Sequence, residues 1–138
     1  MILPPRLFCD TSVFYAALDP TDGYHERAKV LFAAVTESGT RVSVTWDIIS
    51  ETVTLLRYRR NFKAALEFLT DIKPTLHVVA YSDAIRSEAE RVFRQRGATR
   101  RLSFCDAISF VVVTTLLDHM PCAAFDDDFR ALGLTVIH

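Results

Sequence analysis

The acidic side chains that could do chemistry in this sequence stand close to short apolar stretches. Asp10 directly follows one such stretch, and the run Asp126–Asp128 directly follows another, while Glu51 and Asp106 lie near the starts of longer apolar-periodic segments. If folding brings these acids together, their charges repel one another, and a bound cation relieves that repulsion. Carboxylate oxygens suit Mg²⁺ or Mn²⁺ better than zinc, and these ions serve phosphoryl transfer. The acids therefore indicate metal-assisted chemistry on a phosphate ester.

Each acid also has a structural interpretation that needs no metal. Asp10 precedes a short helical segment and can cap it, and Ser103-x-x-Asp106 has the spacing of a capping box. Glu51 lies at the edge of a helical apolar arc, where it could pair with an arginine, and Asp126–Asp128 could form a turn before a helix. Capping and metal binding are compatible, because a capping carboxylate keeps further lone pairs.

Alternating strand-like and helix-like segments would bring these acids to one place. Strands are predicted over Arg6–Cys9, Val42–Trp46, Leu76–Ala80, Cys122–Phe125 and Leu134–Ile137, and helices over Thr11–Leu18, Tyr24–Thr36, Asp47–Arg60, Lys63–Ile72, Ser82–Arg96, Ser103–His119 and Asp127–Leu132. This alternation predicts a single domain over residues 1–138, a three-layer α/β/α sandwich with a mainly parallel sheet of about five strands. In such sheets ligands bind beyond the carboxyl ends of the strands, where several of the acids stand.

The composition narrows the class of protein further. Half of the 138 residues are hydrophobic, 24% are charged, and the net charge is -1, which is typical of a globular domain and excludes a strongly basic nucleic-acid coat. The three cysteines, Cys9, Cys105 and Cys122, are widely spaced and lie in apolar stretches, so we predict buried, reduced thiols in a cytoplasmic protein. We expect no signal peptide, because the N-terminal segment MILPPRLFCD has no basic start and two prolines break its apolar run. We expect no membrane span, because the longest apolar run, Ala107–Leu117, falls well short of ~20 residues.

Four segments together resemble the PIN domain, and within it the VapC-type toxin ribonucleases. They are FCDTSVF with Asp10, ISETVTLLR with Glu51, SFCDAIS with Asp106, and AFDDDF with Asp126 and Asp128. The resemblance implies a PIN-like fold and a metal-dependent endoribonuclease, the toxin of a toxin–antitoxin pair, that cuts RNA with a metal-activated water. It implies Asp10, Glu51, Asp106 and Asp126 as catalytic acids, and Asp10, Asp106, Asp126 and Asp128 as ligands of Mg²⁺ or Mn²⁺. Ser12 matches a hydroxyl that supports the pocket, and we predict that it helps to bind the substrate there.

One position departs from the family pattern. Ala124 stands where the family often has Thr or Ser, two residues before the late aspartate, so one polar contact around the metal is missing. This departure keeps open the alternative of a non-catalytic PIN-like module that binds RNA or a protein partner.

Basic and aromatic residues provide candidates for holding RNA. Cations cluster in two places, the first comprising Arg57, Arg59, Arg60 and Lys63, and the second Arg91, Arg94, Arg96, Arg100 and Arg101. We predict that Arg100 and Arg101 bind substrate phosphates, the alternative being a solvated helix face. Trp46 and Tyr58 could stack on a base, although packing in the core is the more common role of such residues.

Partners are implied by the resemblance alone. They are an RNA substrate, a small cognate antitoxin whose tail fills a groove beside the site, and a second copy of the chain in a homodimer. Apolar residues of the early helices, such as Phe14, Leu31 and Phe32, could line that groove or belong to the domain's own core.

Overall fold

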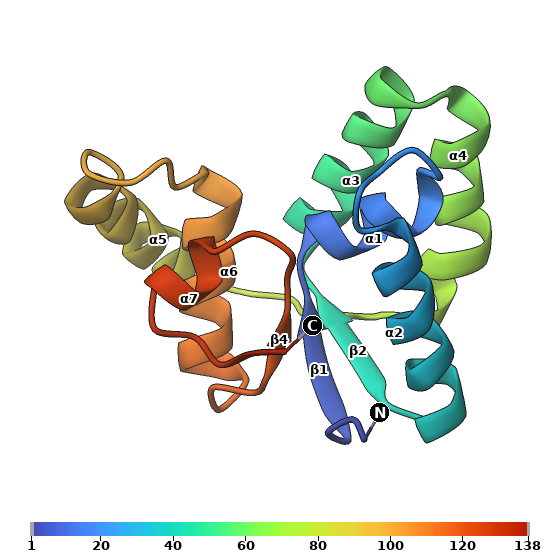
Figure 1. The fold of residues 1–138 in the computed structure, drawn as a ribbon. Coiled ribbons are helices and arrows are strands. Elements are labelled where there is room, and N and C mark those ends of the chain that lie inside the picture. The colour runs from blue at the N-terminus through green and yellow to red at the C-terminus, as the bar shows by residue number, and fades with distance from the viewer. Residues whose placement is uncertain (1, 138) are drawn as a thin grey trace.

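The computed structural model describes residues 2–137 and consists of a parallel sheet between two layers of helices (Figure 1). The strands are β1 (Arg6–Cys9), β2 (Arg41–Val44), β3 (His77–Val78), β4 (Cys122–Ala123) and β5 (Val136–Ile137). Their order is β3-β2-β1-β4-β5, and every neighbouring pair is parallel. β1 is therefore the central strand, and β4, from late in the sequence, lies beside it.

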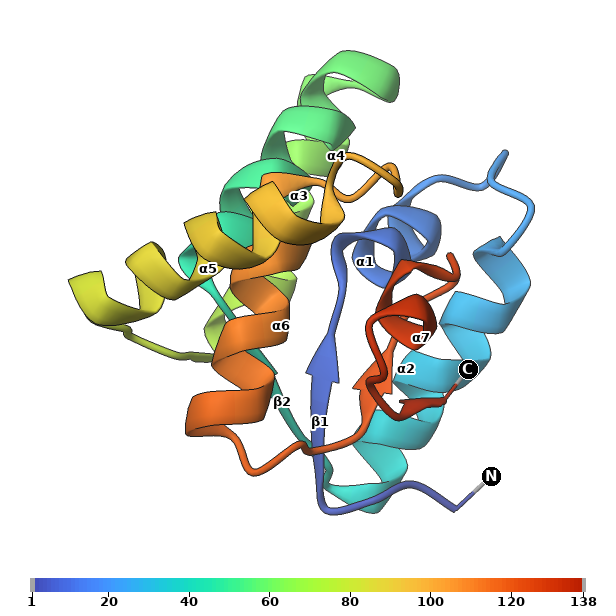
Figure 2. The same ribbon diagram turned by 90° about the vertical axis from the view of Figure 1, so that its left-hand side faces the viewer.

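The helices cover the two faces of the sheet. One layer holds α1 (Thr11–Leu18), α2 (His25–Ser38), α3 (Trp46–Arg59) and α4 (Phe62–Glu67), and the other holds α5 (Asp83–Arg96), α6 (Phe104–Leu116) and α7 (Asp128–Ala131) (Figure 2). A π-helical turn, η1 (Phe68–Ile72), and a 3-10 turn, η2 (Lys73–Thr75), continue from α4 to β3. The three-layer α/β fold predicted from the sequence is confirmed.

Polar side chains fix where the helices begin. Thr45 accepts a hydrogen bond from the Ile48 amide to start α3, and Asn61 accepts one from the Ala64 amide to start α4. Such caps satisfy amide groups that the first turn of a helix leaves without a partner. A glycine ends α2: Gly39 follows its last residue with a φ of 66°, a left-handed conformation that glycine adopts without steric cost.

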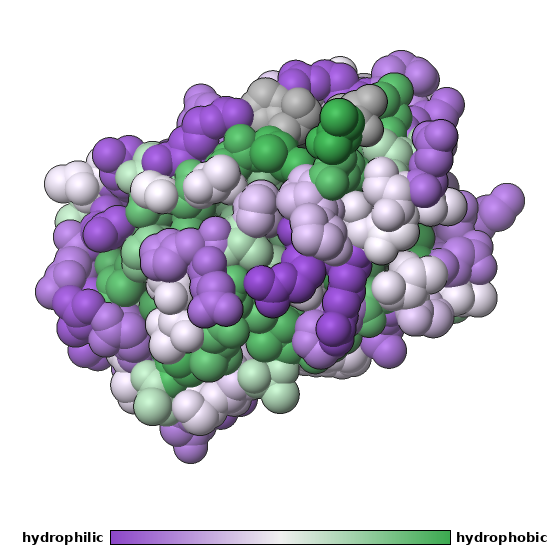
Figure 3. Space-filling view, turned by 90° about the horizontal axis from the view of Figure 1, so that it is seen from below, coloured by the Kyte–Doolittle hydropathy of each residue, from purple (hydrophilic) through white to green (hydrophobic). Residues whose placement is uncertain are grey.

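The core lies on both faces of the central strands and contains four fully buried phenylalanines. Phe14 on α1 packs edge-on against Phe68 with ring centroids 5.4 Å apart, and Phe8 on β1 lies 6.3 Å from Phe129. Phe8 and Phe129 come from opposite ends of the sequence, so their packing ties the two ends together. Figure 3 shows the end of the molecule below the strands in Figure 1, where hydrophobic and hydrophilic residues are interspersed.

Several sequence-based predictions need correction. Trp46, predicted to end a strand, is the first residue of α3, because Thr45 caps that helix. The predicted helix over Lys63–Ile72 is α-helical only to Glu67 and then widens into a π turn. The predicted strands over 76–80, 122–125 and 134–137 shorten to two residues each.

The burial of several residues also differs from expectation. Trp46 and Tyr58 are 59% and 85% exposed, so neither packs in the core. For Phe14 and Leu31, the alternative of the domain's own core is confirmed, since both are fully buried and cannot line a docking groove. All three cysteines are free thiols, but Cys105 is only half-buried. Among the described helices, none combines the length and apolar character needed to cross a bilayer.

Candidate active site

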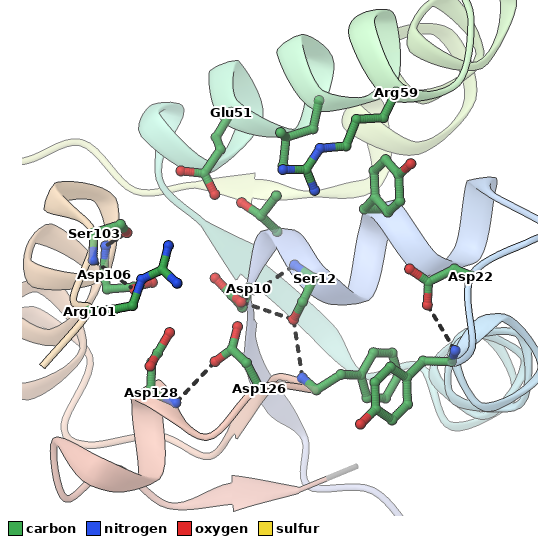
Figure 4. Close-up of a pocket in the computed structure, with 15 residues that line it drawn as sticks. Asp10, Ser12, Asp22, Glu51, Arg59, Arg101, Ser103, Asp106, Asp126 and Asp128 are labelled. Carbon is green, nitrogen blue, oxygen red and sulfur yellow. Dashed lines mark hydrogen bonds between the residues drawn. The ribbon is translucent and has the colours of Figure 1, made fainter.

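The sequence-predicted acids line one pocket above the carboxyl ends of β1 and β4. The pocket has a volume of about 410 Å³ and is lined by Asp10, Glu51, Asp106, Asp126 and Asp128 (Figure 4). Asp10 directly follows β1, and Glu51 lies on α3. Asp106 is in the first turn of α6, Asp126 lies between β4 and α7, and Asp128 is the first residue of α7. Four segments that are distant in sequence therefore supply one acidic pocket.

Asp10 is the most buried of these acids, being only 4% exposed. Burial, followed by the charges of Asp126 and Asp106, raises the pKa of Asp10 to about 7, against the lowering effect of two hydrogen bonds from Ser12. The Ser12 hydroxyl donates to Oδ2 of Asp10 at 2.9 Å, and the Ser12 amide donates to the same oxygen at 3.4 Å. Asp10 thus caps α1, as the structural interpretation proposed, and also faces the pocket.

Asp106 forms the predicted capping box and also lines the pocket. The Ser103 hydroxyl accepts from the Asp106 amide at 2.9 Å, and Oδ2 of Asp106 accepts from the Ser103 amide at 3.2 Å, which completes a capping box. Burial raises the pKa of Asp106 to about 6, and the charges of Asp128 and Asp126 add to this effect against the hydrogen bonds from Ser103. Burial therefore disfavours the ionised form of Asp106 most, and the neighbouring carboxylates disfavour it further.

Ser12 connects the two strands that carry the acids. Its hydroxyl donates to Asp10 after β1 and accepts from the Phe125 amide after β4, at 3.1 Å. Ala124, which departs from the family pattern, is completely buried beside this link. Directly after Phe125, Oδ1 of Asp126 accepts a hydrogen bond from the Asp128 amide at 3.1 Å. This bond forms the turn before a helix that was the structural interpretation of Asp126–Asp128.

Glu51 extends into the pocket from α3, opposite the acids of the β4–α7 segment (Figure 4). The arginine partner considered for Glu51 is not found, because none of the ion pairs among residues 2–137 involves it. Burial raises the pKa of the half-buried Cys105 thiol, and the charges of Glu51, Asp10 and Asp106 add to the rise in that order. Cys105 therefore lies close enough to feel both Glu51 and the acids on the other side of the pocket.

The donor atoms suit a hard divalent cation, although they do not converge on one point. All five acids offer oxygen, and the hydrogen bonds of Asp10, Asp106 and Asp126 each use a single carboxylate oxygen. Burial and mutual repulsion raise the pKa values of Asp10 and Asp106, a cost that a bound cation would relieve. Within residues 2–137, however, no three acidic, histidine or cysteine side chains are arranged to hold a metal ion. Rotation of side chains would be required to coordinate one.

Arginines approach the acids from two directions. Arg101 extends from the segment before α6 and Arg59 from α3, and both line the pocket (Figure 4). Burial, with the charges of Asp126 and Asp127, raises the pKa of Asp128, and Arg100 and Arg101 oppose this rise. Each basic cluster therefore contributes one arginine to the pocket, Arg59 from the first and Arg101 from the second. Arg91 of the second cluster instead pairs with Glu88 on the exposed face of α5.

The pocket contains residues that the sequence did not identify as candidates. They are Thr11, Tyr15, Asp22, Tyr24, Leu55, Ser103 and Phe125, together with Arg59, which appeared only as a member of a cluster. Ser103 had a visible signal in the capping box. Tyr24 and Phe125 had none, because their proximity depends on β4 pairing beside β1.

The fold and the pocket identify the class of protein. The family model of the PIN domain matches residues 7–134, nearly the whole chain. The chain therefore belongs to the PIN-domain family, as the resemblance of its four segments indicated.

Particular relatives carry the comparison further. A VapC ribonuclease from Archaeoglobus fulgidus is 31% identical over 110 residues, which cover 78% of this chain and 69% of the relative. The crystal structure of Mycobacterium tuberculosis VapC20, described as a toxin that cleaves the sarcin-ricin loop, matches with a TM-score of 0.80 and 28% identity, covering 94% of this chain and 96% of that one. FitAcB from Neisseria gonorrhoeae matches in fold, with a TM-score of 0.67 and 17% identity over 96% of both chains. The two VapC proteins confirm the predicted resemblance to VapC-type proteins, and FitAcB supports the fold.

Proposed function

We propose that this protein is a metal-dependent endoribonuclease that hydrolyses RNA phosphodiester bonds as the toxin of a toxin–antitoxin pair. The observation that carries the proposal is the meeting of acids from four sequence segments in one pocket. The relatedness to VapC ribonucleases supports the same reaction. The relatives do not identify the metal, and the oxygen donors favour Mg²⁺ or Mn²⁺.

The side chains divide the work in this proposal. Asp10, Asp106, Asp126 and Asp128 would hold the metal, which when bound supplies an activated water and stabilises charge on the phosphate. Glu51 is the remaining catalytic acid, facing the same space from α3. Ser12 is a positioning residue, because it orients the Asp10 carboxylate and fixes it to the β4 side of the pocket.

Arg100 and Arg101 bind the RNA backbone in this proposal. Arg101 reaches the acidic pocket, and both arginines line an adjoining surface hollow over residues 97–103. Their charge offsets the repulsion that a phosphate meets on approaching the acids, and their guanidinium groups can form bidentate contacts with it.

A non-catalytic RNA- or partner-binding module is the second candidate. It is favoured by the failure of the acids within residues 2–137 to converge with metal-binding geometry, and by Ala124 in place of a hydroxyl residue. The two candidates differ in whether RNA is cut, so one experiment separates them.

The test is RNA cleavage by the purified protein. Total cellular RNA, including ribosomal RNA, is incubated with Mg²⁺ or Mn²⁺ and, in parallel, with EDTA, and the new ends are mapped. We expect discrete cuts that leave 5′-phosphate and 3′-hydroxyl ends, are abolished by EDTA and are abolished by Asp106→Asn. Asp127→Asn, which changes an acid that is 95% exposed in the same β4–α7 segment, is the matched control and keeps activity. Cleavage that persists in EDTA or in Asp106→Asn would contradict the proposal, and absence of cleavage would favour the binding module.

The proposal extends to partners and location. We infer that a small cognate antitoxin neutralises the enzyme, that the chain forms a homodimer, and that it acts in a reducing cytoplasm. Of the groove residues predicted for the antitoxin, only Phe32 remains available, in an apolar hollow shared with Val35 and Ile72. Co-expression with the product of a neighbouring small open reading frame should suppress cleavage, and light scattering should give twice the mass of the chain.

A further inference from the structure

Two aromatic rings form a stacked pair in the wall of the acidic pocket. Tyr24 and Phe125 have ring centroids 4.8 Å apart and planes inclined by only 8°, and both rings line the pocket with Asp10 and Asp126. The Arg27 guanidinium lies over both rings, 5.5 Å from the centroid of Tyr24 and 5.7 Å from that of Phe125. We call these three residues the aromatic platform.

Main-chain contacts hold the platform in place from both sides. The Tyr24 amide donates to Oδ1 of Asp22 at 2.8 Å, and the Phe125 amide donates to the Ser12 hydroxyl at 3.1 Å. Neither of these bonds uses an atom of the Tyr24 or Phe125 ring. The rings are therefore positioned by the chain at two distant points, before α2 and after β4, rather than by their own polar groups.

The platform has one exposed ring. Tyr24 is 42% exposed, whereas Phe125 is half-buried and packs against the core. A nearly parallel ring pair with one exposed ring and a neighbouring cation offers a surface on which a further flat ring can stack. The planar guanidinium above the rings adds positive charge to this wall of a pocket that otherwise carries several negative charges.

We propose that the aromatic platform binds one unpaired nucleobase of the RNA, next to the phosphate that occupies the acidic pocket. The inference rests on the proposed ribonuclease function and adds to it a subsite for a nucleotide. Phe125 directly precedes Asp126, so a base on the platform and a phosphate among the acids belong to neighbouring positions of one strand. A base that stacks on the platform cannot at the same time be paired and stacked in an RNA duplex. The subsite therefore selects nucleotides in loops, bulges or single strands. Arg27 strengthens the stack through its charge.

The experiment measures binding to a single-stranded RNA in protein that cannot cut it. The probe is a fluorescently labelled oligonucleotide of about ten nucleotides, and binding is followed by anisotropy in an Asp10→Asn background with Mg²⁺ present. Tyr24→Ala should weaken binding by about 5- to 150-fold, the usual effect of removing a stacking side chain. Tyr24→Phe keeps the ring and should bind like the parent. Because the Tyr24 side chain caps no helix, its truncation removes no cap from α2.

The matched control is Phe62→Ala on α4. Phe62 is 59% exposed and lies 5.5 Å from the Arg57 guanidinium, so it has a similar arginine–ring contact, but it does not line the acidic pocket. We expect this variant to bind the oligonucleotide as the parent does. Equal loss of binding in Phe62→Ala and Tyr24→Ala would overturn the inference, because it would show a general loss of aromatic surface.

A second measurement locates the base. Oligonucleotides that lack one base at successive positions are bound to the parent and to Tyr24→Ala. At one position, removal of the base should weaken binding to the parent but should not weaken binding to Tyr24→Ala any further. The base and the Tyr24 ring then act as one interacting pair. If the two losses are fully additive at every position, the platform does not hold a base.

The outcomes separate this inference from the proposed function. RNA cleavage with unchanged binding and unchanged KM in Tyr24→Ala rejects the platform and leaves the ribonuclease intact. Binding that depends on Tyr24, in a protein that cuts no RNA with either metal, rejects the ribonuclease and leaves the platform as part of a binding module. An affinity of the oligonucleotide that is the same for Tyr24→Ala and Tyr24→Phe rejects the platform.

Discussion

Replacing Asp10 by Asn should stabilise the metal-free protein at neutral and alkaline pH. Burial and the charges of Asp126 and Asp106 raise the pKa of Asp10 to about 7 in the folded chain, whereas an unfolded aspartate has a pKa of ~3.9. The folded state therefore holds this proton more tightly. The stabilisation from that proton is complete below pH ~4 and is lost as the pH rises through about 7.

The expected magnitude follows from the difference between the two pKa values. About three pKa units correspond to a penalty on the order of 4 kcal/mol when Asp10 is ionised in the fold. Asn has nearly the same shape, its carbonyl oxygen can accept the hydrogen bonds from Ser12, and it carries no charge. In a domain of this size, removal of the penalty would raise the Tm by on the order of 10 °C.

The assay is thermal and urea unfolding in EDTA between about pH 4.5 and pH 8. Asp10→Asn should be more stable than the parent at the alkaline end, and the difference should shrink as the pH falls. Asp127→Asn, which changes an acid of the nearby segment that is 95% exposed, should show a much smaller pH-dependent difference, because, of the pocket acids, its charge affects only the half-buried Asp128. A variant that is less stable than the parent at pH 8, or a difference that is constant across the range, would refute the reasoning. The same variant should cut no RNA.

Three further predictions concern the metal, the RNA-binding arginines and Ser12. Mg²⁺ or Mn²⁺ at a hundred times its Kd should stabilise the parent by about 2.7 kcal/mol in thermal melts, and no shift with either ion would argue against a metal site. Arg100→Gln and Arg101→Gln should each reduce the slope of log affinity for RNA against log salt by about 0.7, while Arg91→Gln, on the face of α5, should leave the slope unchanged. Ser12→Ala should cost about 1–3 kcal/mol in urea unfolding, because a buried carboxylate and a main-chain amide both lose a partner. A stability equal to that of the parent would show that the hydroxyl does not hold the two strands together.

Local signals in the sequence were sufficient for most of the fold. The strand over Arg6–Cys9 and the helix over Thr11–Leu18 have the predicted bounds, because Asp10 both ends the apolar stretch and caps the helix. The capping box at Ser103 and Asp106 likewise has the predicted spacing and lies at the start of α6. Boundaries were wrong where tertiary contacts decide them, as at the short strands β3, β4 and β5.

The candidate site could be predicted for its acids but not for its aromatic and basic walls. Acids that follow parallel strands meet at one edge of the sheet. The residue types and their positions after predicted strands were therefore enough to place Asp10 and Asp126 in one pocket. The meeting of Tyr24 with Phe125 depends on strand order and on how far α2 stands from the sheet, which no local pattern encodes. Trp46 was misjudged as a core residue because hydrophobicity alone does not reveal that the first turn of α3 is exposed.

The position of β4 beside β1 has a consequence during synthesis of the protein. The pocket needs Asp126 and Asp128, which follow β4, together with Asp10, which follows β1. A growing polypeptide on the ribosome lacks the late acids until residues 126–128 have been translated, so the earlier segments alone cannot assemble the pocket. Truncated products that end before these residues would lack the complete acidic pocket, and with it the proposed activity.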